Sequence, residues 1–420
     1  MSYSYHSRPS RSHPSHSHPQ RSPYYGRHRH RRRRRSLLHR GGWGWLVIFG
    51  IVLLAVPVLI FSGGSDRREK DPGKKDPGKK DPVPVVDPVT PVVSPDGKDT
   101  EGEKIVAPSN VYATIPVSGD TQSYAAVYRV GNTAYEYYNY SASCAEGYAN
   151  AVGTLASNLK GVSTVYTIPN PTSTGITLPD ELMGTINSED QKSALEKVTA
   201  LMSSDVKVVP LYDILMQHRT EYIYFRTDHH WTARGAYYAY RSFCDVKGIV
   251  PHELEDYREA VYPDFLGSFY ADTDKNEQLA NMPDEVHAYI PIAQDHGMTH
   301  MHITQSSGPE FDWVVVNDVS SYPTGVKYSA FIGGDYPYTI IANDEITDGS
   351  SCIVVKESFG CAFVPFLVDH YHTIHVIDYR YWNGSLTEFA KTNHVQDVIF
   401  CNNLSAIRSQ SKMGALQRII

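Results

Sequence analysis

Short apolar runs alternate with helical segments over the last 70 or so residues, and this alternation constrains the fold more than any other feature of the sequence. The strand-like runs are CIVVK, IHVID and DVIFCNN, and the helical segments between them are AFVPFLVDHY and SLTEFAKTN. Strands joined by helices of this length pair in parallel, with helices covering both faces of the sheet. We therefore predict an α/β fold with a parallel sheet, and functional residues beyond the carboxyl ends of its strands.

The preceding part of the chain carries weaker versions of the same signals. Apolar runs at 162–169, 206–211 and 222–227 predict three earlier strands, and helices are expected over 146–160, 188–202 and 232–247. Between 250 and 350 the pattern is less regular, with β-like runs such as DWVVVND and TGVKYSAFIGG. We expect a β-rich insertion there.

The N-terminal 62 residues predict a tail and a membrane anchor. Residues 1–40 hold 11 Arg and no acidic residue, a composition that predicts a disordered basic tail. Residues 43–62 are almost wholly apolar and match the roughly 20 residues that a transmembrane helix needs. Because an Arg run stays on the cytoplasmic side, we expect a single-pass plasma-membrane protein with its C-terminal part outside. A cleaved signal peptide is the alternative, although the apolar run is long for one and no A-x-A site follows it.

A linker and one domain make up the rest of the predicted organisation. Residues 63–104 alternate opposite charges with proline, as in DPGKKDPGKKDP, which predicts an extended and solvated linker. The tail contributes +11 and the linker −1 to the formal charge of −7, so residues 105–420, the predicted folded domain, carry −17. A domain this acidic argues against nucleic acid as a partner and favours a neutral or amino-bearing glycan over a strongly anionic polymer.

Two short motifs carry residues suited to nucleophilic catalysis. Asp228-His229-His230 can supply a general base, His230, that a carboxylate holds in one tautomer. A metal site or an ordinary helix cap would use the same residue types. Ser358 lies in the sequence KESFG between a predicted strand and a predicted helix, where its hydroxyl would be exposed as a nucleophile. A plain N-cap is the alternative for this serine.

Two further strand ends offer donors for a developing oxyanion. Arg380 follows the run IHVID, and Asn402 ends the run DVIFCNN. Both side chains can stabilise negative charge, although Asn is also a common turn residue. Adjacent parallel strands would place Ser358, Arg380 and Asn402 along one edge of the sheet, with Asp228 and His230 joining from another strand end.

The motifs together resemble those of a known family. TDHHWT, FIGGDYPY, VVKESFG, HVIDYRYW and DVIFCNN resemble the DHHW protein family, which is similar to the SGNH-hydrolase-like domains of the alginate and peptidoglycan O-acetylation machinery. The resemblance implies a three-layer, flavodoxin-like SGNH fold for residues 105–420 that needs neither a metal nor a cofactor. It also implies that Asp228 orients His230, that His230 is the base and that Ser358 is the nucleophile, with no catalytic role for His229. Glu357 stands where the family usually has Asp.

The resemblance also implies a function. We expect a membrane-anchored, extracytoplasmic serine O-acetyltransferase that acts on a cell-envelope or exported polysaccharide through an acetyl-serine intermediate. Acetyl-CoA is not available outside the cell, so the resemblance implies a multispanning membrane O-acyltransferase as the partner that supplies acetyl groups. A carbohydrate acetyl esterase of the same fold is one alternative. A non-catalytic glycan-binding or envelope-scaffold protein is the other.

Overall fold

The computed structural model of the chain describes residues 119–420. The predicted basic tail (1–40), transmembrane helix (43–62) and linker (63–104) lie outside the described residues. Within residues 119–420, no helix is both long enough and apolar enough to cross a membrane.

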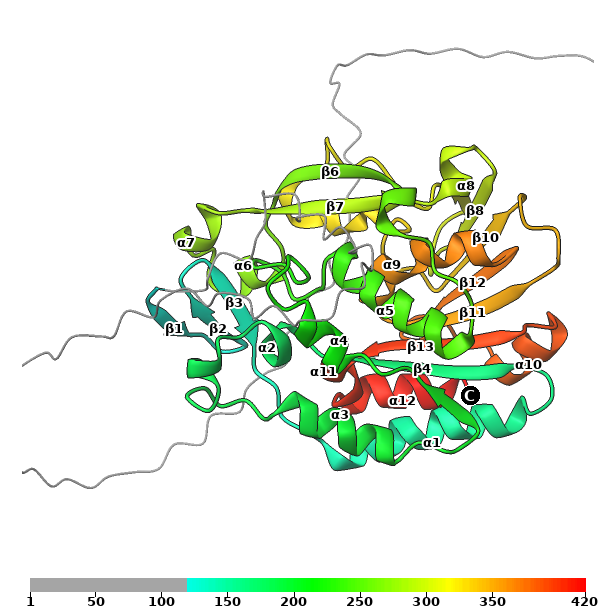
Figure 1. Cartoon of the computed structure of the whole chain (residues 1–420), viewed down its shortest axis with the longest axis horizontal. Coiled ribbons are helices and arrows are strands. Elements are labelled where there is room, and N and C mark those ends of the chain that lie inside the picture. The colour runs from blue at the N-terminus through cyan, green and yellow to red at the C-terminus, as the bar shows by residue number, and fades with distance from the viewer. Residues whose placement is uncertain (1–118) are drawn as a thin grey trace, which may run out of the picture. The chain divides into compact units, whose positions relative to one another are not determined.

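A central sheet of eight strands organises the described part of the chain (Figure 1). Its order is β5-β4-β13-β11-β12-β10-β8-β9. The five strands from β5 to β12 pair in parallel, and β10, β8 and β9 continue the sheet by antiparallel pairing. The strands are β4 (Thr164–Asn170), β5 (Val206–Val208), β8 (Thr299–Thr304), β9 (Phe311–Trp313), β10 (Tyr338–Asn343), β11 (Ser351–Lys356), β12 (Thr373–Asp378) and β13 (Asp397–Asn403). The predicted α/β fold with a parallel-rich sheet is therefore confirmed.

Helices cover both faces of this sheet and form two separate hydrophobic cores. On one face α1 and its neighbours bury apolar side chains such as Tyr148 and Leu155 against β13 and β4. On the other face α5 packs its aromatic side chains, including Tyr240 and Phe243, against the segment that follows β11. The longer helices are α1 (Ala142–Asn158), α3 (Gln191–Ala200), α4 (Tyr212–Gln217), α5 (Ala233–Lys247), α10 (Leu386–Thr392) and α12 (Gln410–Arg418).

Smaller elements surround this three-layer body. The strands β1 (Thr121–Ser123), β2 (Val127–Val130) and β3 (Thr133–Glu136) form an antiparallel meander, and β6 (Arg258–Phe265) pairs with β7 (Asp284–Ile290). The β-rich insertion predicted for 250–350 comprises β6 to β10, but the β-like run TGVKYSAFIGG within it begins with a 3₁₀ helix and forms no strand. The short helices are α2 (Ser173–Ile176), α6 (Ser268–Asp272), α7 (Glu277–Ala280), α8 (Ile292–Asp295), α9 (Gly360–Phe363), α11 (Leu404–Ile407), η1 (Asp180–Leu182), η2 (Leu254–Asp256), η3 (Thr324–Ala330) and η4 (Val364–His370).

The strand predicted over 222–227 is wrong. This segment belongs to no sheet and makes one isolated bridge, between Tyr224 and Trp231. Its amide groups have a different partner, because the buried carboxylate of Asp284 accepts hydrogen bonds from the backbone of Arg226 and Thr227. Asp228 and His230 therefore lie in a loop that leads into α5, and not at the end of a sheet strand.

Candidate active site

Ser358 lies in the turn between β11 and α9, at the carboxyl end of a central parallel strand. Its side chain is partly exposed, whereas both neighbouring residues are buried. The carboxylate of Glu357 holds the turn in place, because it accepts hydrogen bonds from the backbone of Asn403 (3.0 Å) and Phe359 (3.2 Å). The first of these bonds ties the turn to the end of β13, so the position of Ser358 is fixed by two adjacent strands.

The loop that carries Asp228 and His230 is anchored on the same turn. Thr232 caps α5 by accepting a hydrogen bond from the amide of Gly235, and its hydroxyl donates to the carbonyl of Tyr222 (2.7 Å). The buried indole of Trp231 donates from Nε1 to the carbonyl of Phe359 (2.9 Å). The residue after His230 is thus hydrogen-bonded to the residue after Ser358, although the two segments are more than 100 residues apart in the sequence.

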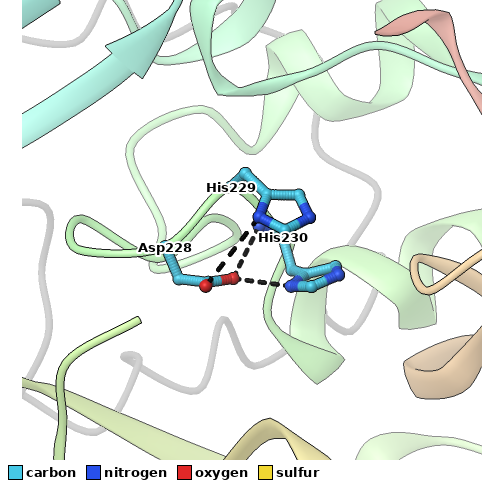
Figure 2. Close-up of side chains that lie close together, drawn as sticks. All are labelled: Asp228, His229 and His230. Atoms are coloured by element: carbon cyan, nitrogen blue, oxygen red, sulfur yellow. Dashed lines mark hydrogen bonds and ion pairs between the residues drawn. The ribbon is translucent and has the colours of Figure 1, made fainter. Parts of the chain in front are cut away.

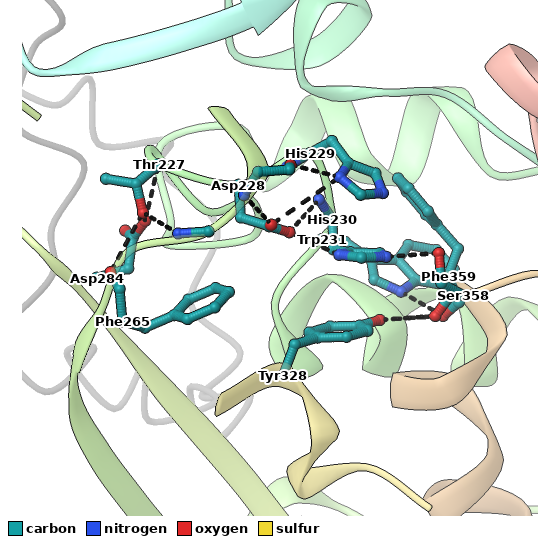
Figure 3. Close-up of polar contacts among 12 residues, drawn as sticks. Thr227, Asp228, His229, His230, Trp231, Phe265, Asp284, Tyr328, Ser358 and Phe359 are labelled. Atoms are coloured by element: carbon teal, nitrogen blue, oxygen red, sulfur yellow. Dashed lines mark hydrogen bonds and ion pairs between the residues drawn. The ribbon is translucent and has the colours of Figure 1, made fainter. Parts of the chain in front are cut away.

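The side chains of Asp228, His230 and Ser358 form one hydrogen-bonded chain; Figure 2 shows Asp228 and His230 beside His229, and Figure 3 adds Ser358. His230 Nδ1 lies 2.6 Å from Asp228 Oδ1, and His230 Nε2 lies 2.7 Å from Ser358 Oγ. Because an ionised carboxylate only accepts hydrogen bonds, we assign the ring hydrogen to Nδ1, which leaves Nε2 free to accept the hydrogen of Ser358. The structure therefore brings together the three residues that the sequence singled out.

Asp228 is buried and ionised. Burial by itself would raise the pKa of its carboxyl group, but the adjacent His230 and His229 and the hydrogen bonds to the carboxylate outweigh burial and hold the pKa below its ordinary value. One such bond comes from the backbone amide of Ser268 to Oδ2 (2.8 Å), and another from the amide of His230 to Oδ1 (3.0 Å). The carboxylate is therefore fixed by donors on both of its oxygens.

The imidazole of His230 lies between two other rings. Tyr328 stacks on it with ring centroids 3.9 Å apart and an interplanar angle of 8°, and His229 approaches it at 3.8 Å and 37°. Two rings this close to one imidazole must lie on its opposite faces, as Figure 3 shows. The hydroxyl of Tyr328 also donates to the carbonyl of Ser358 (3.1 Å). These contacts fix the orientation of the imidazole ring, in which Nε2 of His230 faces Ser358.

His229 is in contact with a second serine, Ser268. Its Nδ1 lies 2.6 Å from Ser268 Oγ, the first residue of α6. Burial, together with the neighbouring His230, lowers the pKa of His229. No local sequence signal distinguishes Ser268 or Tyr328 from surface residues of the insertion, so the sequence analysis missed both.

The structure places Arg380 and Asn402 at the same edge of the sheet but engages them differently. The guanidinium of Arg380 is bound by Asp378 (2.6 Å) and Asp335 (2.8 Å), in a network with the buried Lys356. Asn402 accepts a hydrogen bond from the hydroxyl of Tyr148, and its buried Nδ2 has no partner within the described residues. Among the hydrogen bonds of residues 119–420, neither side chain contacts Ser358.

Asp228, His229 and His230 are also the one group within residues 119–420 whose side chains lie close enough to ligate a metal ion together, with ligand atoms within 4.8 Å of one another. The carboxylate of Asp228 and three of the four imidazole nitrogens already have protein partners. Both ring nitrogens of His230 are hydrogen-bonded, and Nδ1 of His229 is in contact with Ser268. A metal at this position would have to break the chain from Asp228 to Ser358.

The fold and this geometry together define a class. A partly exposed serine at the carboxyl end of a parallel strand, hydrogen-bonded to a histidine that a buried carboxylate orients, is the arrangement of α/β proteins with a Ser-His-Asp triad. More narrowly, the chain belongs to the DHHW family, because the family model described as DHHW protein matches residues 89–377, which is more than half of the chain.

The chain is also similar, to different degrees, to solved structures. A DHHW family protein from Eubacterium siraeum is 26% identical with a TM-score of 0.65, covering 73% of this chain and 99% of that one. PatB1 from Bacillus cereus, solved with a sulfonyl adduct, is 17% identical with a TM-score of 0.57 and covers 70% and 98%. The O-acetyltransferase domain of Pseudomonas putida AlgJ is 10% identical, with a TM-score of only 0.37 over 68% and 96% of the two chains. No curated protein matches the sequence.

Proposed function

We propose that the protein is a serine O-acetyltransferase that transfers an acetyl group to a hydroxyl of a cell-envelope or exported polysaccharide. The observation that carries this proposal is the hydrogen-bonded chain from Asp228 through His230 to Ser358, with contacts of 2.6 and 2.7 Å. Membership of the DHHW family, whose motifs resemble those of polysaccharide O-acetylation proteins, supports the acetyl group as cargo. The charge of −17 on residues 105–420 favours a neutral or amino-bearing glycan as the acceptor.

The chemistry proceeds in two halves. In the first, His230 Nε2 takes the proton of Ser358 as Oγ attacks the acetyl carbonyl, and the leaving group of the donor then receives that proton. In the second, a sugar hydroxyl gives its proton to His230 and attacks the acetyl-serine ester, and Ser358 recovers a proton as it leaves. Asp228 keeps Nδ1 protonated and stabilises the imidazolium that forms in each half.

Asn402 is the better of the two proposed donors to the oxyanion. Its Nδ2 is buried and has no partner within the described residues, and Tyr148 fixes the amide by donating to Oδ1. The guanidinium of Arg380 instead donates hydrogen bonds to Asp378 and forms an ion pair with Asp335. A buried unpaired donor costs stability unless a ligand uses it, which is a reason to give Asn402 this role.

Sulfonyl labelling and acetyl release test the proposal directly. The full chain should release acetate from p-nitrophenyl acetate and react with a sulfonyl fluoride at Ser358, a reagent class suggested by the sulfonyl adduct known for PatB1. Ser358→Ala should abolish both, and Ser405→Ala, a partly exposed serine bound to Glu136, is a matched control that should leave both unchanged. Equal acetate release by the wild type and Ser358→Ala would refute the proposal that the protein is an enzyme with Ser358 as its nucleophile. No release by the wild type would favour the glycan-binding or scaffold alternative.

A carbohydrate acetyl esterase is the second candidate, because Ser358 is partly exposed and water can reach an ester formed on it. Incubation with acetyl donor and a glycan separates the two: acetylated glycan supports transfer, and free acetate as the sole product supports the esterase.

The setting of the reaction follows from the N-terminal sequence. Residues 43–62 would anchor the protein in the plasma membrane, and the linker over 63–104 would hold the domain outside, where a multispanning membrane O-acyltransferase would supply acetyl groups. Protease added to intact cells should then digest the domain and spare the Arg-rich tail. Protection of the domain would contradict this topology.

A further inference from the structure

A second serine–histidine contact lies beside the chain just described, and the proposed mechanism gives it no role. Ser268 Oγ lies 2.6 Å from His229 Nδ1 and accepts a hydrogen bond from the backbone amide of His229 (3.2 Å). The amide of Ser268 donates to Asp228 Oδ2, so one carboxylate organises both serine–histidine pairs. His229 and Ser268 are therefore connected to the same carboxylate as the residues of the proposed triad.

The contacts of Ser268 are the basis on which we assign the tautomer of His229. Within residues 119–420, His229 Nδ1 is the one side-chain acceptor within hydrogen-bond distance of Ser268 Oγ, so we assign the hydroxyl hydrogen of Ser268 to the bond with Nδ1. Nδ1 is then unprotonated, and in a neutral imidazole the hydrogen must be on Nε2. Because burial and the adjacent His230 lower the pKa of His229, the ring is neutral at pH 7.

The Nε2 edge of His229 lies next to the reacting atoms. Nδ1 of both histidines faces Asp228, at 2.6 Å for His230 and 3.9 Å for His229, and the two ring centroids are 3.8 Å apart. Both Nε2 edges therefore turn away from the carboxylate, as Figure 2 shows. Nε2 of His230 contacts Ser358, whereas the side chain of His229 is 36% exposed and its Nε2 has no hydrogen-bond partner within the described part of the chain.

Two neighbouring imidazole nitrogens of opposite character form a binding site for two oxygens. Nε2 of His230 accepts a proton, and Nε2–H of His229 donates one. The two rings are tilted by 37° with their centroids 3.8 Å apart, so two oxygens on neighbouring sugar carbons can reach both nitrogens. We propose that His229 is an acceptor-binding residue that donates a hydrogen bond to the oxygen next to the reacting hydroxyl, so that the enzyme acetylates hydroxyls with a vicinal oxygen in preference to isolated ones. This inference rests on the proposed acetyl transfer and specifies its acceptor.

Competition between two small alcohols on the same acetyl-enzyme tests the inference. The full chain receives p-nitrophenyl acetate with ethylene glycol, which has a vicinal hydroxyl, and ethanol, which has none, and the ratio of the two acetate esters is measured. Because both alcohols attack the same intermediate, changes in acylation rate or folded fraction cancel. One neutral hydrogen bond contributes about 0.5–1.5 kcal/mol, so the wild type should favour glycol roughly 2- to 13-fold per hydroxyl.

Two substitutions at one position serve as each other's control. The side-chain amide of His229→Gln places its nitrogen near the position of Nε2 and should keep most of the preference for glycol. His229→Asn reaches only the position of Nδ1 and should lose it. Ser268→Ala should also lose it, because Nδ1 would then be protonated toward Asp228 and Nε2 would become an acceptor. In the His229→Gln background, which has no tautomers, Ser268→Ala should change nothing.

The tautomer itself gives a readout that does not depend on activity. The ¹⁵N chemical shifts of His229 should show hydrogen on Nε2 in the wild type and on Nδ1 in Ser268→Ala. A wild-type ring protonated on Nδ1 would overturn the inference. So would equal glycol-to-ethanol ratios in the wild type, His229→Gln and His229→Asn, provided that transfer needs Ser358. If Ser358→Ala transfers acetyl groups as fast as the wild type, the proposed function fails together with this inference.

Discussion

Gly267 is the position at which one added methyl group should disable the site with little effect on the rest of the fold. It precedes α6 and packs directly against Asp228. A Cβ at Gly267 would come within 2.2 Å of Asp228 Oδ2 and 2.3 Å of its Cβ, whereas ordinary contact begins at 3.4 Å. The backbone at Gly267 has φ −88°, so any residue could adopt it, and the cost of Gly267→Ala is steric alone.

The size of that clash sets the expected loss of activity. The carboxylate must move by the difference between 3.4 and 2.2 Å, which is 1.2 Å. Its hydrogen bonds to His230 Nδ1 (2.6 Å) and from the amide of Ser268 (2.8 Å) cannot both survive a shift of this size. A misplacement of about 1 Å in a catalytic arrangement costs roughly 10²-fold in rate, and overpacking costs about 1–3 kcal/mol of stability.

Acetate release from p-nitrophenyl acetate, corrected for the folded fraction by a thermal melt, measures both effects for Gly267→Ala. Gly325→Ala is the matched control: it is an exposed glycine whose added Cβ would lie 3.6 Å from its nearest neighbour, the carbonyl of Leu266. The control should keep the wild-type rate. A folded Gly267→Ala variant with the wild-type rate would refute the idea that the position of Asp228 controls activity.

Four further predictions concern the surroundings of the site and the stability of the fold. Tyr328→Phe keeps the stacked ring on His230 and should lower kcat only a few-fold, whereas Tyr328→Leu should lower it more than tenfold; equal effects would argue against stacking. Lys356→Met leaves Arg380 as the remaining cation for both Asp378 and Asp335. One negative charge of the network then loses its compensation, which should cost about 3–5 kcal/mol in urea unfolding, so an unchanged midpoint would contradict the network. Burial lowers the pKa of His370 to about 4, so the unfolded chain binds a proton at this residue before the folded chain does. The free energy of unfolding should therefore fall as the pH drops from about 6.5 to 4, and His370→Gln should reduce this fall by up to about 3 kcal/mol. Gly414→Ala, with open space around an exposed position in α12, should raise stability by about 0.5–1 kcal/mol, and a lower Tm would refute this.

The sequence predicts the bounds of the last three strands of the sheet in chain order nearly to the residue. The runs CIVVK, IHVID and DVIFCNN correspond to β11, β12 and β13, because strands buried on both faces read as continuous apolar runs. The run at 222–227 is also largely apolar but is no strand. Its amides bond to Asp284, about 60 residues further along the chain, and apolar patterning does not indicate which acceptor a backbone amide will find.

The error in that strand did not spoil the prediction of the site, and the reason is physical. Asp228 and His230 are placed by their own hydrogen bonds and by the Trp231 contact to Phe359, which needs no regular strand. Residue chemistry at short spacing therefore predicted their pairing. The role of Arg380 could not be predicted in this way, because a cation binds the nearest buried carboxylates, here Asp378 and Asp335.

Ser268 lay beyond sequence reasoning for a related reason. Ser268 contacts His229 although the two are 39 positions apart in the sequence, and no sequence motif contains both residues. The proposed triad was predictable because its members have to be Asp, His and Ser, whereas the residue proposed to set the tautomer of His229 only has to be some hydroxyl in the right place. The tautomer of His229, on which the proposed acceptor recognition depends, is therefore a property that only the structure can assign, and a ¹⁵N shift on His229 is the measurement that decides it.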